Sequence, residues 1–202
     1  TYMGDAGVDF FSRSGKTQAS ATLYVGRITD AISYVYAQHP TLPGVQIVRT
    51  SNSDEVSIKG LELALRRQIL PNWSGYANYT LNRSRITVSA TNKGHQLRNS
   101  PDNLANFGLQ YADNRRRQGA SFYARYSDTR YYDDENTPLK YYFMREYLTL
   151  GIKLYKTIPV GGREVTFSVG VDNLTNSKYD AEFINQAPGR FIEAGVTYRF
   201  GF

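Results

Sequence analysis

The feature that most constrains the fold is an alternation of apolar and polar residues that recurs along most of the chain. The segment "FIEAGVTYRFGF" shows it at residues 191–202, where every second side chain is apolar or aromatic. A period of two is the side-chain period of a β-strand. No segment keeps the 3.6-residue period of an amphipathic helix over ten or more residues. The sequence therefore predicts an all-β protein.

This alternation predicts about nine strands. They lie near 5–12, 17–36, 53–68, 73–88, 103–113, 119–132, 140–157, 164–174 and 190–202. Several are longer than the roughly 5–6 residues common in soluble proteins. A tilted membrane-spanning strand of about 9–11 residues suits their lengths better.

The connections between these strands alternate in length. Those after odd-numbered strands are tight, namely "RSGK", "LPN", "NRRRQ" and "PVGGR". Those after even-numbered strands are long and polar, namely "QHPTLPGVQIVRTSN", "SATNKGHQLRNSPD", "YDDENTPL" and "TNSKYDAEFINQAPG". Outer-membrane barrels have short periplasmic turns and longer extracellular loops. We therefore expect an antiparallel up-and-down transmembrane β-barrel in which each strand pairs with its sequence neighbours.

The charges on the polar side of the strands support the same interpretation. A soluble barrel of this size would have to bury them, whereas a wet lumen accommodates them. We expect the lumen to hold Arg66, Tyr123, Arg125, Lys153, Thr166, Ser168, Glu193, Thr197 and Arg199. We expect the lipid to face Leu61, Leu63, Leu65, Phe107, Leu109, Phe122, Leu148, Leu150, Ile152, Phe167, Val169, Val196 and Tyr198.

Composition excludes several classes of function. The chain has no cysteine, so it forms no disulfide, thiolate metal site or cysteine nucleophile. Its net charge is +6, but the basic residues are scattered and form neither a basic helix nor a zinc-finger pattern, which argues against nucleic-acid binding. No hydrolase or phosphate-binding motif is present. We expect no enzymatic activity, no catalytic residue, no cofactor and no bound metal.

Two sets of loop residues are candidates for ligand binding. The segment "DTRYYDDENTPLKYYF" gathers Arg130, Tyr131, Tyr132, Lys140 and Tyr141 at a loop mouth. Arginine and aromatic groups suit an anionic, catecholate-like iron chelate, and an ordinary interfacial aromatic girdle beside a solvated loop is the alternative. The two histidines, His39 and His95, could ligate iron or haem. Because no paired spacing supports a metal site, two solvated loop histidines are the alternative.

Four segments resemble a known family when read in order: "IKGLELALRRQILPNWSGYANYTL", "NSPDNLANFGLQY", "VDNLTNSKY" and "APGRFIEAGVTYRFGF". Together they resemble the C-terminal barrel repeats of TonB-dependent outer-membrane receptors. The resemblance covers residues 58–202, and residues 1–57 fit as two preceding strands. The sequence departs from the family pattern at Asn103, where histidine is frequent, and in ending two residues beyond the usual Tyr-x-Phe.

The resemblance implies more than the residues show. Such receptors have about 22 strands around an N-terminal plug. They reside in the outer membrane of Gram-negative bacteria and import a scarce nutrient, commonly a ferric siderophore, haem or cobalamin, with energy relayed by TonB. A ferric siderophore is the ligand that we expect here. Nine strands without a plug imply that residues 1–202 are the C-terminal part of such a barrel, completed by the remainder of the barrel and contacting TonB through the missing N-terminal part. The alternatives are a complete small porin or adhesin barrel and, less favoured, a barrel-rim hydrolase.

The last strand carries a further expectation. In this family the barrel-assembly machinery recognises the final strand and its terminal aromatic residue. Tyr198, Phe200 and Phe202 are therefore the expected assembly signal. An unpaired last strand offers free N–H and C=O groups to an added strand, which agrees with such a role.

Overall fold

The computed structural model describes residues 1–136, 138, 143–182 and 185–199. For residues 33–37, 46, 48–53 and 182 it describes the backbone alone. The described residues form strands, turns and bends, and none of them belongs to a helix long and apolar enough to cross a membrane. The predicted all-β class is confirmed.

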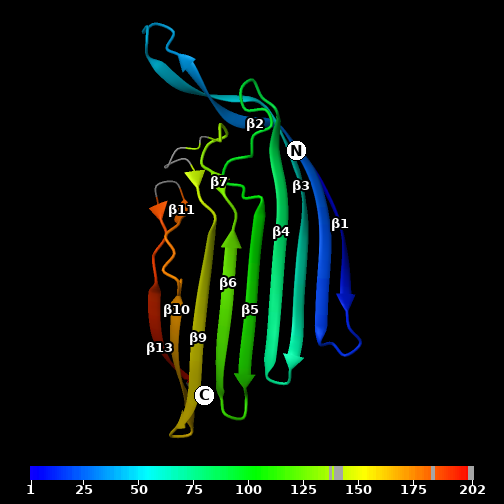
Figure 1. Cartoon of the computed structure of the whole chain (residues 1–202), viewed down its shortest axis with the longest axis vertical. Helices are drawn as coiled ribbons and strands as arrows, with labels where there is room; N and C mark the ends of the chain where they lie inside the picture. Colours follow the sequence, from blue (N-terminus) through cyan, green and yellow to red (C-terminus); the bar gives the residue numbers. More distant parts are fainter. Residues whose placement is uncertain (137, 139–142, 183–184, 200–202) are drawn as a thin grey trace.

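Nine strands pair into one antiparallel sheet in the order in which they follow along the chain (Figure 1). They are β1 (Tyr2–Phe11), β2 (Thr17–Gln38), β3 (Gln46–Leu70), β4 (Trp73–Val88), β5 (Asn103–Asp113), β6 (Gln118–Ser127), β9 (Tyr147–Val160), β10 (Arg163–Asp172) and β13 (Phe191–Arg199). The predicted meander is confirmed, because every neighbour in the sheet is also the neighbour in sequence apart from two inserted hairpins.

The two inserted hairpins correct the predicted bounds of two strands. The hairpin of β7 (Arg130–Tyr131) and β8 (Phe143–Met144) lies between β6 and β9, and that of β11 (Asp180–Glu182) and β12 (Asn185–Gln186) lies between β10 and β13. The strand predicted over 119–132 therefore ends at Ser127, and the one predicted over 140–157 runs from Tyr147 to Val160. The predicted last strand is described only to Arg199, so Phe200 and Phe202 lie outside the described residues.

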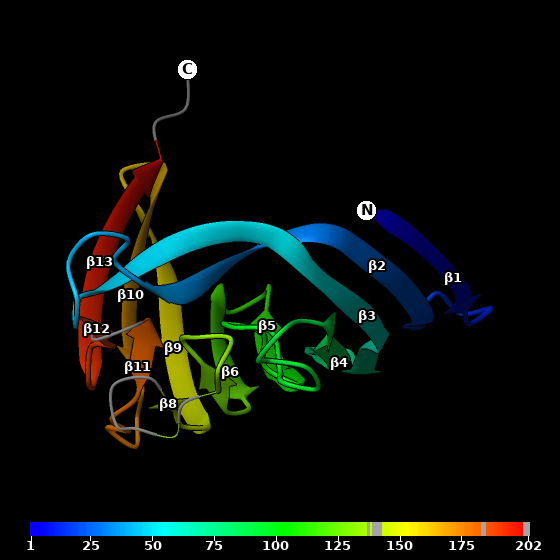
Figure 2. The ribbon, with the colours of Figure 1, turned by 90° about the horizontal axis from the view of Figure 1, so that it is seen from above.

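The sequence predicted a long loop between β2 and β3, and this prediction is wrong. Most of "QHPTLPGVQIVRTSN" is strand, and only residues 39–45 separate β2 from β3. The register shifts between Ile28 and Ala31 and again between Ala31 and Ser33, and Asp30 has a positive φ of 55°. Such bulges bend a strand and increase its twist. The hairpin accordingly bends over the hollow side of the sheet beyond the other loops (Figures 1 and 2).

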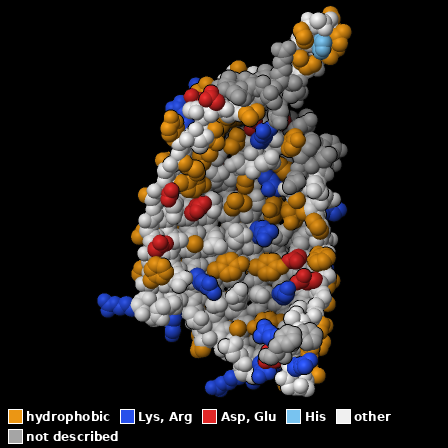
Figure 3. Space-filling view, turned by 180° about the vertical axis from the view of Figure 1, so that it is seen from behind, with side chains coloured by type: hydrophobic (Ala, Val, Ile, Leu, Met, Phe, Trp, Pro, Cys, Tyr) orange, Lys and Arg blue, Asp and Glu red, His pale blue; other side chains and the backbone are white. Residues whose placement is uncertain are grey.

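The sheet is curved like part of a barrel wall, with a concave and a convex face (Figure 2). Cross-strand pairing places Arg66, Tyr76, Gly108, Tyr123 and Gly151 in one row on one face. Figure 3 looks onto the concave face and shows basic and acidic side chains scattered across it. The register and this view together place the polar residues predicted for the lumen on the concave face, which confirms the predicted orientation.

The convex face is apolar and uncovered. One row across it alternates large and small side chains, namely Leu65, Ala77, Phe107, Ala124 and Leu150. Leu63, Phe107 and Leu148 are 41%, 46% and 50% exposed. Among the described residues the buried hydrophobic side chains are only Val56, Ile86, Met144 and Ala187. An apolar face this large requires a cover, and a bilayer supplies one.

The connections define two ends of the sheet. The turn end carries the tight connections 12–16, 71–72, 114–117 and 161–162, and the loop end carries 39–45, 89–102, 128–146 and 173–190. All four tight connections lie at the same end in Figure 1. The predicted alternation of short and long connections is therefore confirmed, except that the connection between β2 and β3 is much shorter than predicted.

Candidate functional site: the mouth formed by the long loops

Two of the long loops are tied together by hydrogen bonds. The backbone N–H of Gln96 donates to Asn136 Oδ1 at 2.7 Å, and Asn136 Nδ2 donates back to the carbonyl of Gln96 at 2.8 Å. The N–H of Asn99 donates to the carbonyl of Tyr131 at 2.7 Å. The N–H of Arg98 donates to Asp134 Oδ1 at 3.1 Å. These bonds join the described residues of loops 89–102 and 128–146 into one rim.

Asp102 anchors this rim to the wall. Its carboxylate pairs with the guanidinium groups of Arg83 and Arg85, the second at 2.5 Å between Arg85 Nη2 and Asp102 Oδ2. Asp102 is buried, whereas the two arginines of β4 are partly exposed. A buried carboxylate is stable only with such charged partners. The "NSPDN" segment thus closes loop 89–102 onto β4.

The loop after β10 is organised by asparagines. Asn173 Nδ2 donates to the carbonyl of Ser177 at 2.9 Å, and the N–H of Ser177 donates to Asn173 Oδ1 at the same distance. Asn176 Oδ1 accepts the N–H of Arg190 at 2.8 Å, and Arg190 Nε donates to the carbonyl of Leu174 at 3.1 Å. The "DNLTNS" and "PGR" segments therefore meet and close loop 173–190 at its base.

The ligand candidates predicted in loop 128–146 are only partly gathered. Arg130 Nη2 donates to the carbonyls of Asp180 and Ala181 at 2.8 and 2.5 Å, so it links this loop to β11. The ring of Tyr131 packs against Phe143 with 5.4 Å between centroids. Tyr132 is partly exposed. Lys140 and Tyr141 lie outside the described residues.

The two histidines serve different loops. His39 Nδ1 accepts the N–H groups of Thr41 and Leu42 at 3.2 and 3.1 Å, which closes the tip of the β2–β3 hairpin. His95 Nδ1 lies 3.1 Å from the carbonyl oxygen of Asp134. Within the described part of the chain no three His, Cys, Asp or Glu residues form a group able to hold a metal ion.

Sequence reasoning missed a basic and aromatic pocket between loops 128–146 and 173–190. It has a volume of about 580 Å³ and is lined by Phe143, Arg145, Lys178, Tyr179 and Asp180, among others. Tyr179 also stacks on Tyr147, with ring centroids 4.0 Å apart and an interplanar angle of 19°. The adjacent Lys178 and Tyr179 in a long loop were the signal in the sequence.

A second hollow lies on the concave face directly below this pocket. It also has a volume of about 580 Å³, and its lining includes Tyr123, Arg125, Asp172, Phe191 and, again, Tyr179. Tyr123 donates a hydrogen bond to Asp172 there. Because Tyr179 lines both spaces, the mouth pocket and the concave face adjoin through its ring.

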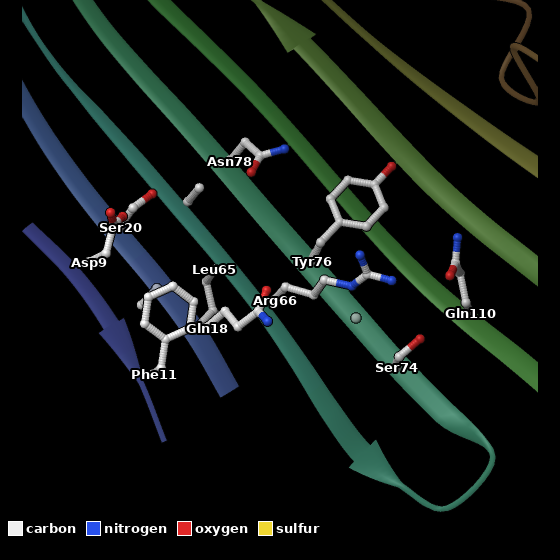
Figure 4. Close-up of a pocket in the computed structure, with 13 residues that line it drawn as sticks. Asp9, Phe11, Gln18, Ser20, Leu65, Arg66, Ser74, Tyr76, Asn78 and Gln110 are labelled. Carbon is white, nitrogen blue, oxygen red and sulfur yellow. The ribbon is translucent and has the colours of Figure 1, made fainter. Parts of the chain in front are cut away.

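A third hollow lies on the concave face nearer the turn end (Figure 4). Its volume is about 500 Å³, and Asp9, Ser20, Asn78 and Gln110 give it a polar lining. Arg66 extends from β3 over β4 toward Tyr76 (Figure 4). This concave face therefore offers polar side chains along its whole length.

Comparison with protein families decides what kind of barrel this is. The family model "TonB dependent receptor-like, beta-barrel" matches residues 4–174. The chain belongs to the TonB-dependent receptor family. The resemblance drawn from the four sequence segments is thereby confirmed, and the match extends it toward the N-terminal strands. A comparison with curated proteins finds no match.

Solved structures of TonB-dependent receptor type share the fold at low sequence identity. The siderophore receptor PiuA from Acinetobacter baumannii superposes with a TM-score of 0.76 at 19% identity, covering 96% of this chain and 28% of PiuA. The ferric citrate transporter FecA superposes with a TM-score of 0.76 at 15% identity, covering 94% of this chain and 30% of FecA. The copper transporter OprC superposes with a TM-score of 0.74 at 21% identity, covering 98% of this chain and 32% of OprC. The chain thus spans less than a third of each of these receptors.

Proposed function

We propose that this TonB-dependent receptor barrel belongs to an outer-membrane importer of an anionic iron chelate, a ferric siderophore, in a Gram-negative bacterium. The observation that carries the proposal is the pocket at the loop end. It presents the cations Arg145 and Lys178 beside the aromatic rings of Phe143 and Tyr179. It adjoins a second hollow on the concave face, which gives a bound solute a polar surface leading inward.

The chemistry of the pocket favours a chelate over a bare metal ion. The two cations outnumber the one carboxylate of the lining, Asp180, so the pocket has a net positive charge that repels a free metal cation, and the described residues offer no cluster of metal ligands. Guanidinium and ammonium groups attract the negative charge of a catecholate or carboxylate iron complex, and aromatic rings stack on its planar arms. PiuA is named as a siderophore receptor and BauA as a ferric preacinetobactin receptor, whereas OprC is named as a copper transporter. The fold therefore permits several cargoes, and the lining selects among them.

The proposal extends to the parts of the receptor that this chain does not contain. In it, residues 1–202 form the C-terminal part of the barrel wall, a plug fills the lumen, and TonB binds through the N-terminal part. The ligand-binding role of Arg130, Tyr131, Tyr132, Lys140, Tyr141, His39 and His95 stays a prediction, as does the assembly role of Tyr198, Phe200 and Phe202. A receptor explains the pairing of Arg145 and Lys178 with aromatic rings in this pocket, whereas a porin, adhesin or hydrolase does not require it.

Binding of an iron chelate by the full-length receptor tests this proposal. The double variant Arg145→Ala/Lys178→Ala removes two charges from the pocket and should weaken binding of a ferric tris-catecholate about tenfold or more, because each charged contact contributes about 1 kcal/mol or more. Titration followed by intrinsic fluorescence measures the dissociation constant. Uptake of radioactive iron by cells with and without TonB then tests the energy source.

The matched control is Lys93→Ala. Lys93 is an exposed cation of loop 89–102 that does not line the pocket. It should leave the dissociation constant within about twofold of the wild type, since a distant exposed charge is screened by salt. Equal losses in both variants, or none in the double variant, would contradict the proposed site.

A further inference from the structure

An arginine on the convex face stands out from its surroundings. Arg67 follows Leu61, Leu63 and Leu65 on β3 at two-residue spacing, so it lies on the same face as these leucines. Its neighbour Arg66 lies on the concave face. A charge that faces lipid is costly unless it reaches a polar partner at the interface. Within the part of the chain that the structure describes, Arg67 forms no ion pair.

The surroundings of Arg67 are basic. Arg67 pairs with Thr17, which begins β2, and the carbonyl of Lys16 accepts the N–H of Gln68 at 2.8 Å. The turn-end segments 12–16, 66–73, 113–118 and 156–164 together contain nine Lys or Arg and two Asp or Glu. The loop-end segments 38–46, 89–102, 128–146 and 173–190 together contain seven Lys or Arg and eight Asp or Glu. The excess of positive charge therefore lies at the turn end.

An apolar groove lies on the convex face close to Arg67, which does not itself line it. Its volume is about 700 Å³, and Ala19, Leu65, Ala77, Ala105, Phe107 and Ala124 contribute to its lining. Leu65 is two residues from Arg67, or about 7 Å along the strand. Alanines alternate with large side chains in the row of Leu65, and their short side chains help to open the groove.

An aromatic pair marks the membrane interface at the same place. Trp73 and Tyr111 pair across β4 and β5 with ring centroids 5.1 Å apart. Gly75 is the residue that pairs with Arg67. Trp73 is two residues before Gly75 on β4, so it lies on the same face as Arg67 and nearer the turn. Tryptophan and tyrosine favour the level of the lipid headgroups. The guanidinium of Arg67 can reach that level by extending along the strand.

We propose that Arg67 and the adjoining groove bind one anionic glycerophospholipid of the leaflet at the turn end. The headgroup phosphate accepts hydrogen bonds from the guanidinium, and an acyl chain lies in the groove. Charge complementarity favours this occupant, since a phospholipid joins an anionic headgroup to an apolar chain and the groove lies within a few residues of a cation that forms no ion pair among the described residues. The inference rests on the proposed outer-membrane placement, in which the turn end faces the periplasm.

Quenching of Trp73 by brominated lipids tests the inference in the full-length receptor. Trp73 is the single tryptophan of this chain, and the difference from a Trp73→Phe variant isolates its signal. The receptor is reconstituted in phosphatidylcholine bilayers that contain brominated phosphatidylglycerol or, at the same fraction, brominated phosphatidylcholine. The ratio of the two quenching constants measures the preference for the anionic lipid. We expect a ratio of about five, since one cation near an anionic surface has about this effect.

Three variants sharpen the test. Arg67→Gln should bring the ratio to about one, Arg67→Lys should retain most of it, and Arg66→Gln should leave it unchanged because Arg66 faces the lumen. Equal quenching by both lipids in the wild type, or an equal effect of Arg66→Gln and Arg67→Gln, would overturn the lipid site. No quenching of Trp73 by either lipid would overturn the membrane placement itself. Loss of quenching on adding a soluble protein from the periplasm would assign the groove to a protein partner and overturn the proposal.

Discussion

Four tyrosines on the concave face each lie over a glycine of the neighbouring strand. The pairs are Tyr24 with Gly60, Tyr76 with Gly108, Tyr123 with Gly151, and Tyr155 with Gly119. A Cβ added to any of these glycines would collide with the tyrosine ring. The ring shields the exposed glycine backbone and fixes the register of the two strands.

A single methyl group at Gly151 tests this packing. Gly151→Ala should lower the free energy of unfolding by about 1–3 kcal/mol, because the Tyr123 ring must shift and its hydrogen bond to Asp172 is strained. The matched control is Gly4→Ala in β1, where a Cβ meets nothing within 4 Å and a small gain in stability is expected. Urea unfolding in detergent measures both. Equal stability of the two variants would contradict a packing role for the tyrosines.

Sequence alone identified which residues share a face but not which residues touch. The alternation of Ser121, Tyr123 and Arg125 with Phe122 and Ala124 is a local property, so it predicted the faces correctly. The contact of Tyr123 with Gly151 depends on the register of β6 against β9, which the sequence does not state. The same reason hid the pocket around Arg145 and Lys178, whose members come from two loops about 30 residues apart in the chain.

At the scale of elements, the long loops behave as structured rims rather than as free connections. Asp102 binds two arginines of β4, and loop 89–102 is hydrogen-bonded to loop 128–146 through Gln96, Arg98 and Asn99. The β2–β3 hairpin was mistaken for a loop because its polar, proline-containing tip hides the strand pattern on either side. Its bend at Asp30 requires a positive φ, which aspartate tolerates better than most residues.

Removing the anchor should loosen the rim without unfolding the wall. Asp102→Asn deletes the charge that binds Arg83 and Arg85, and amide hydrogen exchange at residues 94–97 should accelerate about tenfold. The control Glu135→Gln removes one exposed acidic charge from the neighbouring loop and should leave exchange there unchanged. Exchange in β5 and β6 should be the same in both variants. Faster exchange throughout the sheet would contradict a local anchor.

At the scale of the whole molecule, the chain has a curved wall and hardly any conventional core. The exposed apolar side chains of the strands lie mainly on the convex face, and charges such as Arg66, Arg125 and Lys153 lie on the concave face, so the sheet separates two environments. Family membership explains this arrangement, because a receptor barrel places lipid outside and a plugged, polar lumen inside. This separation depends on the register of the strands. A slip of one residue would turn Lys153 and Arg125 toward lipid.

Spin labels placed along β9 test this claim most directly. This chain has no cysteine, so single cysteines at positions 148, 149, 150, 152, 153 and 154 of the full-length receptor, with any other cysteine removed, report one site each. Gly151 is left unlabelled because a side chain there collides with Tyr123. Labels at Leu148, Leu150, Ile152 and Leu154 should be accessible to oxygen and shielded from a water-soluble nickel reagent, and labels at Thr149 and Lys153 should show less access to oxygen. The account predicts that oxygen access alternates with a period of two in this phase. The opposite phase, or uniform accessibility along the strand, would contradict it.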